Sequence, residues 1–144
     1  MIAPMARTIL VALDGSTREA EVFRTAAKLA AADGASLNIC RAVTIPIGLP
    51  DAVWSMSMAQ LDATLIAEAQ RAVDVRAAEV PGAKAMVRMG QPADVICDIA
   101  KEIGADLVVI GAHGYGAIER LLGTTASKIV HRAPCSVLVV RPTA

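Results

Sequence analysis

The sequence predicts an α/β protein: one domain with a doubly wound, five-stranded parallel sheet in the order 3-2-1-4-5 and helices on both faces. Three observations lead to this fold class. Five short apolar runs alternate with four segments of helical periodicity. The runs are continuously apolar, as strands buried on both faces are. The length of 144 residues suits a single domain.

The first strand is expected at Thr8–Leu13, a short and continuous apolar run. Ser16 and Glu19 then have the S-x-x-E spacing of a capping box, which predicts the start of a helix. Alanines and Phe23 recur at helical intervals after this start, and Gly34 ends the helix.

The second strand is expected at Ser36–Val43. Residues 44–51 contain two prolines and a glycine and therefore predict a loop. A long helix follows from about Trp54 to Glu79, with larger apolar residues and alanines on one face. Pro81 and Gly82 break this helix.

The remaining elements continue the alternation of strand and helix. They are a strand at Ala83–Met89, a helix from Pro92 to Gly104, a strand at Asp106–Ile110, a loop at residues 111–122, a helix at Thr124–Arg132 and a strand at Cys135–Val140. Residues 1–6 are expected to be an N-terminal tail, and residues 7–144 the domain.

A ligand is expected where strands one and four end, because open parallel sheets bind ligands outside the carboxyl ends of their strands. Asp14 follows strand one. The loop after strand four contains Gly111 and Gly114, which let the backbone turn sharply and approach a ligand closely. His113 lies between them; we interpret it as a residue that orients the loop, and we include it among the candidate nucleotide-binding residues.

Gly123, Thr124 and Thr125 stand at the start of the last predicted helix. The first N–H groups of a helix have no intrahelical partner, and the helix dipole favours an anion at this end. Two hydroxyls beside these amides complete a phosphate cradle without a fixed positive charge.

Composition argues against several classes of partner. Lys plus Arg and Asp plus Glu both number 14, and only three aromatic residues occur, which disfavours a nucleic-acid partner. No apolar run approaches the ~18–20 residues of a membrane span. The first residues lack the pattern of a secretory signal, and the three cysteines lack C-x-x-C spacing. We therefore expect a cytoplasmic protein with no membrane or nucleic-acid partner, no metal and no catalytic residue.

Four segments together resemble the universal stress protein family: residues 9–16 (ILVALDGS), 90–96 (GQPADVI), 105–114 (ADLVVIGAHG) and 123–140 (GTTASKIVHRAPCSVLVV). The resemblance covers about residues 7–141. Nucleotide-binding members carry G-x-x-G, nine residues and then G-[S/T]. Gly111, Gly114, Gly123 and Thr124 match this pattern, although only eight residues intervene here.

The resemblance implies a Rossmann-like domain that binds ATP, with or without Mg²⁺, and acts in stress response without strong catalysis. It implies that Asp14 and the backbone of Ala12, Leu13 and Ala42 contact adenine and ribose. It further implies that Ile110 and Gly111 line the ribose, and that the phosphates are held by Gly114, Gly123, Thr124 and Thr125. Members commonly form homodimers through the last strand, here Cys135–Arg141, whose apolar edge would otherwise be an aggregation liability.

Two alternatives stay open. The protein could be a nucleotide-independent homodimeric interaction module. It could also be a slow ATPase or phosphoryl-transfer enzyme, although no G-x-x-x-x-G-K-[ST] loop occurs. A hydride-transfer enzyme is disfavoured because no G-x-G-x-x-G follows the first strand.

Overall fold

The computed structural model describes residues 6–45, 57–112 and 122–141. Along these residues five strands alternate with four helices. The strands are β1 (Thr8–Ala12), β2 (Ser36–Val43), β3 (Lys84–Met89), β4 (Leu107–Gly111) and β5 (Ser136–Val140). The helices are α1 (Glu19–Asp33), α2 (Met58–Ala77), α3 (Pro92–Ile103) and α4 (Thr124–Arg132).

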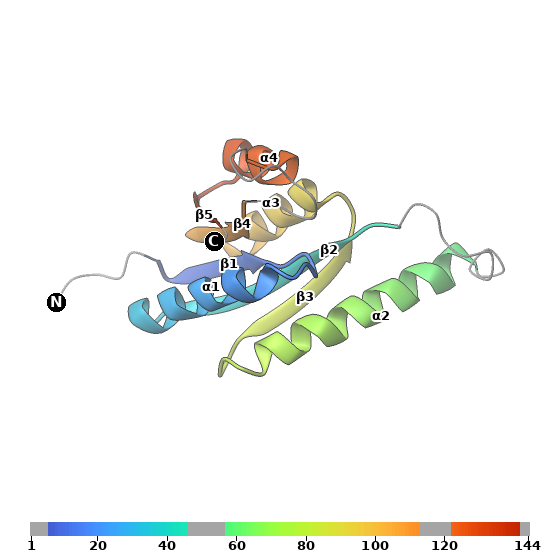
Figure 1. Cartoon of the computed structure of the whole chain (residues 1–144), viewed down its shortest axis with the longest axis horizontal. Helices are drawn as coiled ribbons and strands as arrows, with labels where there is room; N and C mark the ends of the chain where they lie inside the picture. Colours follow the sequence, from blue (N-terminus) through green and yellow to red (C-terminus); the bar gives the residue numbers. More distant parts are fainter. Residues whose placement is uncertain (1–5, 46–56, 113–121, 142–144) are drawn as a thin grey trace.

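All strand pairs are parallel, and the sheet has the order β3-β2-β1-β4-β5, which confirms the predicted topology. In Figure 1 the sheet separates α3 and α4 above from α1 and α2 below. The strand order reverses at β1, since β2 lies on one side of it and β4 on the other. The carboxyl ends of β1 and β4 are therefore neighbours, as the ligand prediction requires.

Two apolar clusters cover the two faces of the sheet. Alternate side chains of a strand point to opposite faces. Leu10 of β1 therefore packs with α3 and α4, whereas Ile9 and Val11 pack with α1 and α2. All three are fully buried. Burial on both faces explains why the first strand reads as a continuous apolar run.

The cysteines pack as small apolar residues. Cys40 and Cys97 are buried, and Cys135 is half-buried. Burial raises the pKa of the Cys40 thiol to about 12, so this group stays neutral at physiological pH.

The predicted capping box at Ser16 and Glu19 is wrong. Helix α1 begins at Glu19, and its N-cap residue, Arg18, makes no side-chain cap. The Ser16 hydroxyl instead accepts a hydrogen bond from the Arg18 amide at 3.3 Å. The Glu19 carboxylate reaches back to the amide of Gly15 at 2.8 Å. These side chains therefore shape the turn between β1 and α1, and the capping box does not form.

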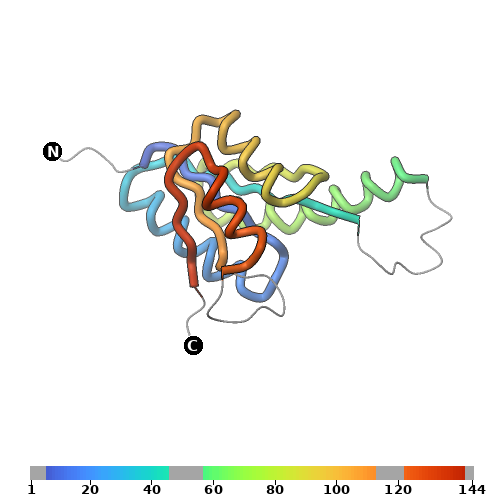
Figure 2. Tube along the Cα trace, turned by 90° about the horizontal axis from the view of Figure 1, so that it is seen from above, coloured from blue at the N-terminus to red at the C-terminus, as the bar shows by residue number. Residues whose placement is uncertain are grey.

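The predicted start of the long helix is also wrong, because the reciprocal cap lies at Ser57. Its hydroxyl accepts from the Gln60 amide at 3.1 Å, and the Gln60 side chain accepts from the Ser57 amide at 2.9 Å. Ser57 has extended backbone angles, so α2 begins at Met58; Trp54 lies outside the described residues. The first turns of α2 extend beyond the sheet (Figure 2), and Met58 is 61% exposed.

Candidate functional site

A cavity of about 600 Å³ lies at the carboxyl ends of β1, β2 and β4. Its walls come from both faces of the sheet, since residues of α1, α3 and α4 also line it. The residues that line it are Ala12, Leu13, Asp14, Ser16, Arg18, Glu19, Val22, Ala42, Thr44, Pro92, Ile96, Ile110, Gly111, Ala112, Leu122, Gly123, Thr124, Thr125, Ala126 and Ile129.

The strand ends place backbone groups at one end of this cavity. The amide of Leu13 donates to the carbonyl of Cys40 at 2.9 Å. This hydrogen bond continues the pairing of β1 and β2 by one residue beyond the end of β1. Ala42 stands two residues after Cys40 on β2, so its N–H and C=O point in the same direction as those of Cys40. They therefore point past the end of β1, towards the cavity that Ala42 lines.

The turn after β1 is held by three side-chain contacts. The Asp14 carboxylate accepts from the Ser16 amide at 2.9 Å, which forms an Asx turn. One oxygen of the Glu19 carboxylate accepts from the Gly15 amide, and its other oxygen lies 3.5 Å from Nη2 of Arg76 on α2. Arg76 also sits over the Phe23 ring, 5.8 Å from its centroid. The charge of Glu19 is thus offset by Arg76, away from the cavity.

The start of α4 forms the opposite wall of the cavity. The Gly123 amide donates to the Ala112 carbonyl at 2.8 Å, so the residue before α4 lies beside the residue after β4. Gly123 is the N-cap of α4, and no side chain caps this helix. Thr124 and Thr125 follow, both exposed and both lining the cavity. An anion at the first amides of α4 stays a prediction, which the lack of a side-chain cap at Gly123 is consistent with.

Arg18 is a charged residue of the cavity that the sequence analysis did not identify. It lines the cavity from the start of α1. Its Nη1 atom is buried and has no hydrogen-bond partner among the described residues. The S-x-x-E spacing drew attention to Ser16 and Glu19 and left Arg18 without an assigned role. The sequence feature that could have identified Arg18 as a cavity residue is its position shortly after the carboxyl end of β1.

The structure brings together nine of the residues predicted as ligand contacts. Ala12, Leu13, Asp14, Ala42, Ile110, Gly111, Gly123, Thr124 and Thr125 all line the one cavity. His113 and Gly114 lie outside the described residues. The contact of each residue with a nucleotide stays a prediction.

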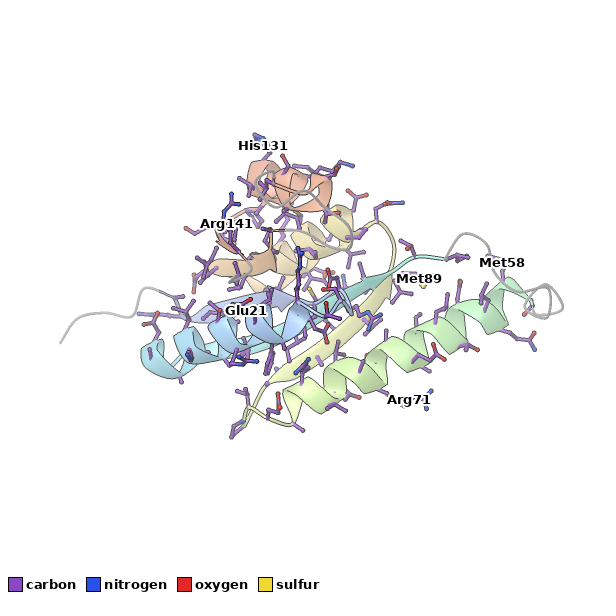
Figure 3. The ribbon with its side chains drawn as sticks, in the orientation of Figure 1. Glu21, Met58, Arg71, Met89, His131 and Arg141 are labelled. Atoms are coloured by element: carbon purple, nitrogen blue, oxygen red, sulfur yellow. The ribbon has the colours of Figure 1, made fainter. Side chains whose placement is uncertain are left out.

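A second cavity of about 430 Å³ adjoins the first and shares Asp14, Ala42 and Thr44 with it. Arg41 of β2 and Glu68 of α2 contribute charged side chains to this second space. In contrast, the side chains of Arg71 and His131 point away from the sheet, from the outer sides of α2 and α4 (Figure 3).

Comparison with known proteins agrees with this fold. Residues 5–141 match the model of the universal stress protein family. A Thermus aquaticus protein named for its family, the universal stress protein in the QAH/OAS sulfhydrylase 3′ region, is 35% identical over 139 residues, covering 95% of this chain and 100% of the relative.

Two solved structures are similar to the chain along nearly its whole length. The universal stress protein UspA from Lactobacillus plantarum superposes with a TM-score of 0.78 at 30% identity, covering 94% of this chain and 97% of that one. A universal stress protein solved in complex with cAMP gives a TM-score of 0.72 at 26% identity, covering 96% and 99%.

Among the described residues, no helix combines the length and apolar character needed to cross a membrane. The match to the family model spans nearly the whole chain, and the sheet has the order predicted from the sequence. The chain therefore belongs to the universal stress protein family.

Proposed function

We propose that this protein binds an adenine nucleotide, specifically ATP, in the cavity of about 600 Å³ at the carboxyl edge of its sheet. We propose that it acts as a cytoplasmic stress-response or regulatory protein without strong catalysis. The observation that carries this proposal is the convergence of strand ends β1, β2 and β4 with the uncapped start of α4 in one space.

The chemistry of the cavity walls suits a nucleotide. Its volume lies within the ~300–1,000 Å³ of typical small-molecule sites. One region combines apolar side chains such as Val22 and Ile110 with the backbone groups of Ala42, which fits a flat heterocycle with hydrogen-bonding edges. Another region combines the first amides of α4 with the guanidinium of Arg18, which fits phosphate.

A relative supports the class of ligand. The universal stress protein that is 26% identical to this chain was solved in complex with cAMP, an adenine nucleotide. That ligand is a property of the relative, and its chemistry makes an adenine nucleotide the first candidate for this chain.

Calorimetric titration with ATP and GTP, each with and without Mg²⁺, tests the proposal. We expect ATP to bind at least roughly tenfold more tightly than GTP, because a site built for the hydrogen-bonding edge of one base leaves polar groups unpaired with another. Equal affinities would remove the adenine assignment and leave a phosphate site. A folded protein that binds neither nucleotide would refute the proposal and favour the interaction-module alternative.

Turnover on the same sample separates binding from catalysis. We expect little or no phosphate release from bound ATP, since no catalytic residue is assigned to the site. Sustained turnover would instead support the alternative of a slow ATPase.

We also propose that two copies pair through the last strand, Cys135–Arg141. The part of this segment that forms β5 stands at one edge of the sheet and is apolar except for Ser136.

A further inference from the structure

Arg18 is a charged residue at the cavity wall, and part of its guanidinium is buried. Its Nη1 atom is buried without a hydrogen-bond partner among the described residues. A buried charged group that lacks a partner costs more free energy than a neutral one, so such a group normally has a partner in the working protein. The other two charged residues that line the cavity, Asp14 and Glu19, do not supply it.

Both of these carboxylates are engaged elsewhere. Asp14 accepts a hydrogen bond from the Ser16 amide at 2.9 Å. Glu19 accepts from the Gly15 amide at 2.8 Å and pairs with Arg76 at 3.5 Å. No ion pair joins Arg18 to another described residue. Among the residues that the structure describes, no carboxylate therefore pairs with the positive charge of Arg18.

The backbone of Arg18 is held in place, whereas its Nη1 atom has no hydrogen-bond partner among the described residues. The amide of Arg18 donates to the Ser16 hydroxyl at 3.3 Å, and the residue forms the N-cap of α1. Its side chain lines the same cavity as Gly123, Thr124 and Thr125. Helices α1 and α4 pack on opposite faces of the sheet, so the cavity has an anion-binding element on each side.

We propose that Arg18 binds the phosphate chain beyond the first phosphate and thereby makes the site selective for a nucleoside polyphosphate over a monophosphate. The inference rests on the proposed function and deepens it. A monophosphate is short enough to use only the amides at the start of α4. A diphosphate or triphosphate extends further and carries the additional charge that the guanidinium of Arg18 would neutralise.

Titrations of ATP and AMP into the wild type and the Arg18→Gln variant test this inference. We expect the variant to lose roughly tenfold or more of its ATP affinity, the range of one charge-assisted hydrogen bond. Its AMP affinity should change by less than about threefold, since the first phosphate does not reach Arg18. Arg18→Lys should recover part of the ATP affinity, because it keeps the charge and loses the planar fork.

Arg24→Gln is the matched control. Arg24 lies on the same helix and is exposed, and it does not line the cavity. Its substitution removes the same charge from the protein and should leave both affinities unchanged. The melting temperature of nucleotide-free Arg18→Gln should equal or exceed that of the wild type, because the substitution removes a buried charge that has no partner.

The outcomes distinguish a failure of the proposed function from a failure of the role assigned to Arg18. A wild type that binds neither ATP nor AMP would refute the proposed function and this inference with it. A wild type that binds both, together with an Arg18→Gln variant whose ratio of ATP to AMP affinity is unchanged, would refute only the role of Arg18. The ratio is measured on one folded preparation, so a partly inactive sample does not affect it. If Arg18→Gln does not fold, Arg18→Met provides the same ratio.

Discussion

Gly15 occupies the turn between β1 and α1, where the backbone conformation and the guanidinium of Arg41 both disfavour a side chain. Its φ of +77° lies in the left-handed region, which residues with a Cβ rarely adopt. A Cβ built at this position would also lie 2.7 Å from Nη2 of Arg41. The turn that shapes the candidate site therefore depends on the absence of one side chain.

We expect Gly15→Ala to lower the free energy of unfolding by more than the ~1–2 kcal/mol that a left-handed residue with a Cβ costs. Gly82→Ala is the matched control, because Gly82 has a φ of +81° and nothing lies within 4 Å of its added Cβ. Urea unfolding of both variants measures the difference. Equal losses would show that Arg41 moves aside without cost and that only backbone strain matters.

Helix α4 shows how the start of an element can serve a ligand. Its N-cap, Gly123, has φ −61° and ψ 158°, which any residue can adopt. The glycine is therefore not needed for backbone conformation, and a change at this position is expected to act on the ligand site.

We expect Gly123→Asp to abolish ATP binding in a protein that stays folded. The carboxylate would occupy the anion site and repel the phosphates, while an aspartate at an N-cap is itself well tolerated. Gly123→Asn is the control, since it has nearly the same shape without the charge and should retain most of the affinity. Titration, circular dichroism and a melting curve measure the effect. If folded Gly123→Asp binds ATP as tightly as wild type, the phosphates do not lie at this helix.

Asp106 joins β4 to β1 at the amino edge of the sheet, away from the candidate site. Its carboxylate accepts from the amides of Arg7 at 2.7 Å and Thr8 at 3.0 Å. These two backbone hydrogen bonds hold the pKa of Asp106 below its ordinary value of 3.8. A carboxyl group whose pKa is lower in the folded state stabilises the fold at pH values above its unfolded pKa.

We therefore expect Asp106→Asn to melt at a lower temperature than wild type at neutral pH. The difference should shrink as the pH falls through the lowered pKa of Asp106, because protonation removes the same charge from the wild type. Melting curves over a pH series measure this. Asp94→Asn is the control, since Asp94 pairs with Arg132 on the surface, and an exposed ion pair contributes little. A difference that is constant at all pH values would contradict the role of the charge.

The two edges of the sheet differ at the scale of the whole molecule. The β3 edge carries Lys84 and Arg88, both exposed, and charged side chains on an edge strand oppose pairing with another chain. The β5 edge carries no charged residue between Ser136 and Val140, and its four apolar residues are half-buried. The β5 edge is therefore the one suited to a second copy.

We expect the protein to be a homodimer paired through β5, because pairing covers an apolar edge that is otherwise open to aggregation. Light scattering over a concentration series measures the mass. A monomer mass at micromolar concentration would refute the expectation. A dimer that persists when a lysine replaces Leu138, in a variant that circular dichroism shows to be folded, would place the interface elsewhere.

The sequence determined the architecture and the main elements of the candidate site. The apolar runs predicted five buried strands because both faces of a parallel sheet are covered, and right-handed crossovers left few possible strand orders. The predicted contacts at Asp14, Gly111 and Gly123 came from their positions at strand and helix ends. Local signals such as these act over a few residues, which is the range in which sequence patterns are informative.

Only the tertiary structure decided what Ser16, Arg18 and Glu19 do. The S-x-x-E spacing favoured a capping box, but Glu19 bonds instead to Gly15 and pairs with Arg76, which is 57 residues away in the sequence. No local pattern encodes a contact at that separation, because packing of α1 beside α2 on one face of the sheet brings the two side chains together. Arg18 lines the cavity, and its Nη1 atom has no hydrogen-bond partner in the described part of the chain. Burial and missing partners are properties of the folded molecule, so the sequence alone could not reveal them.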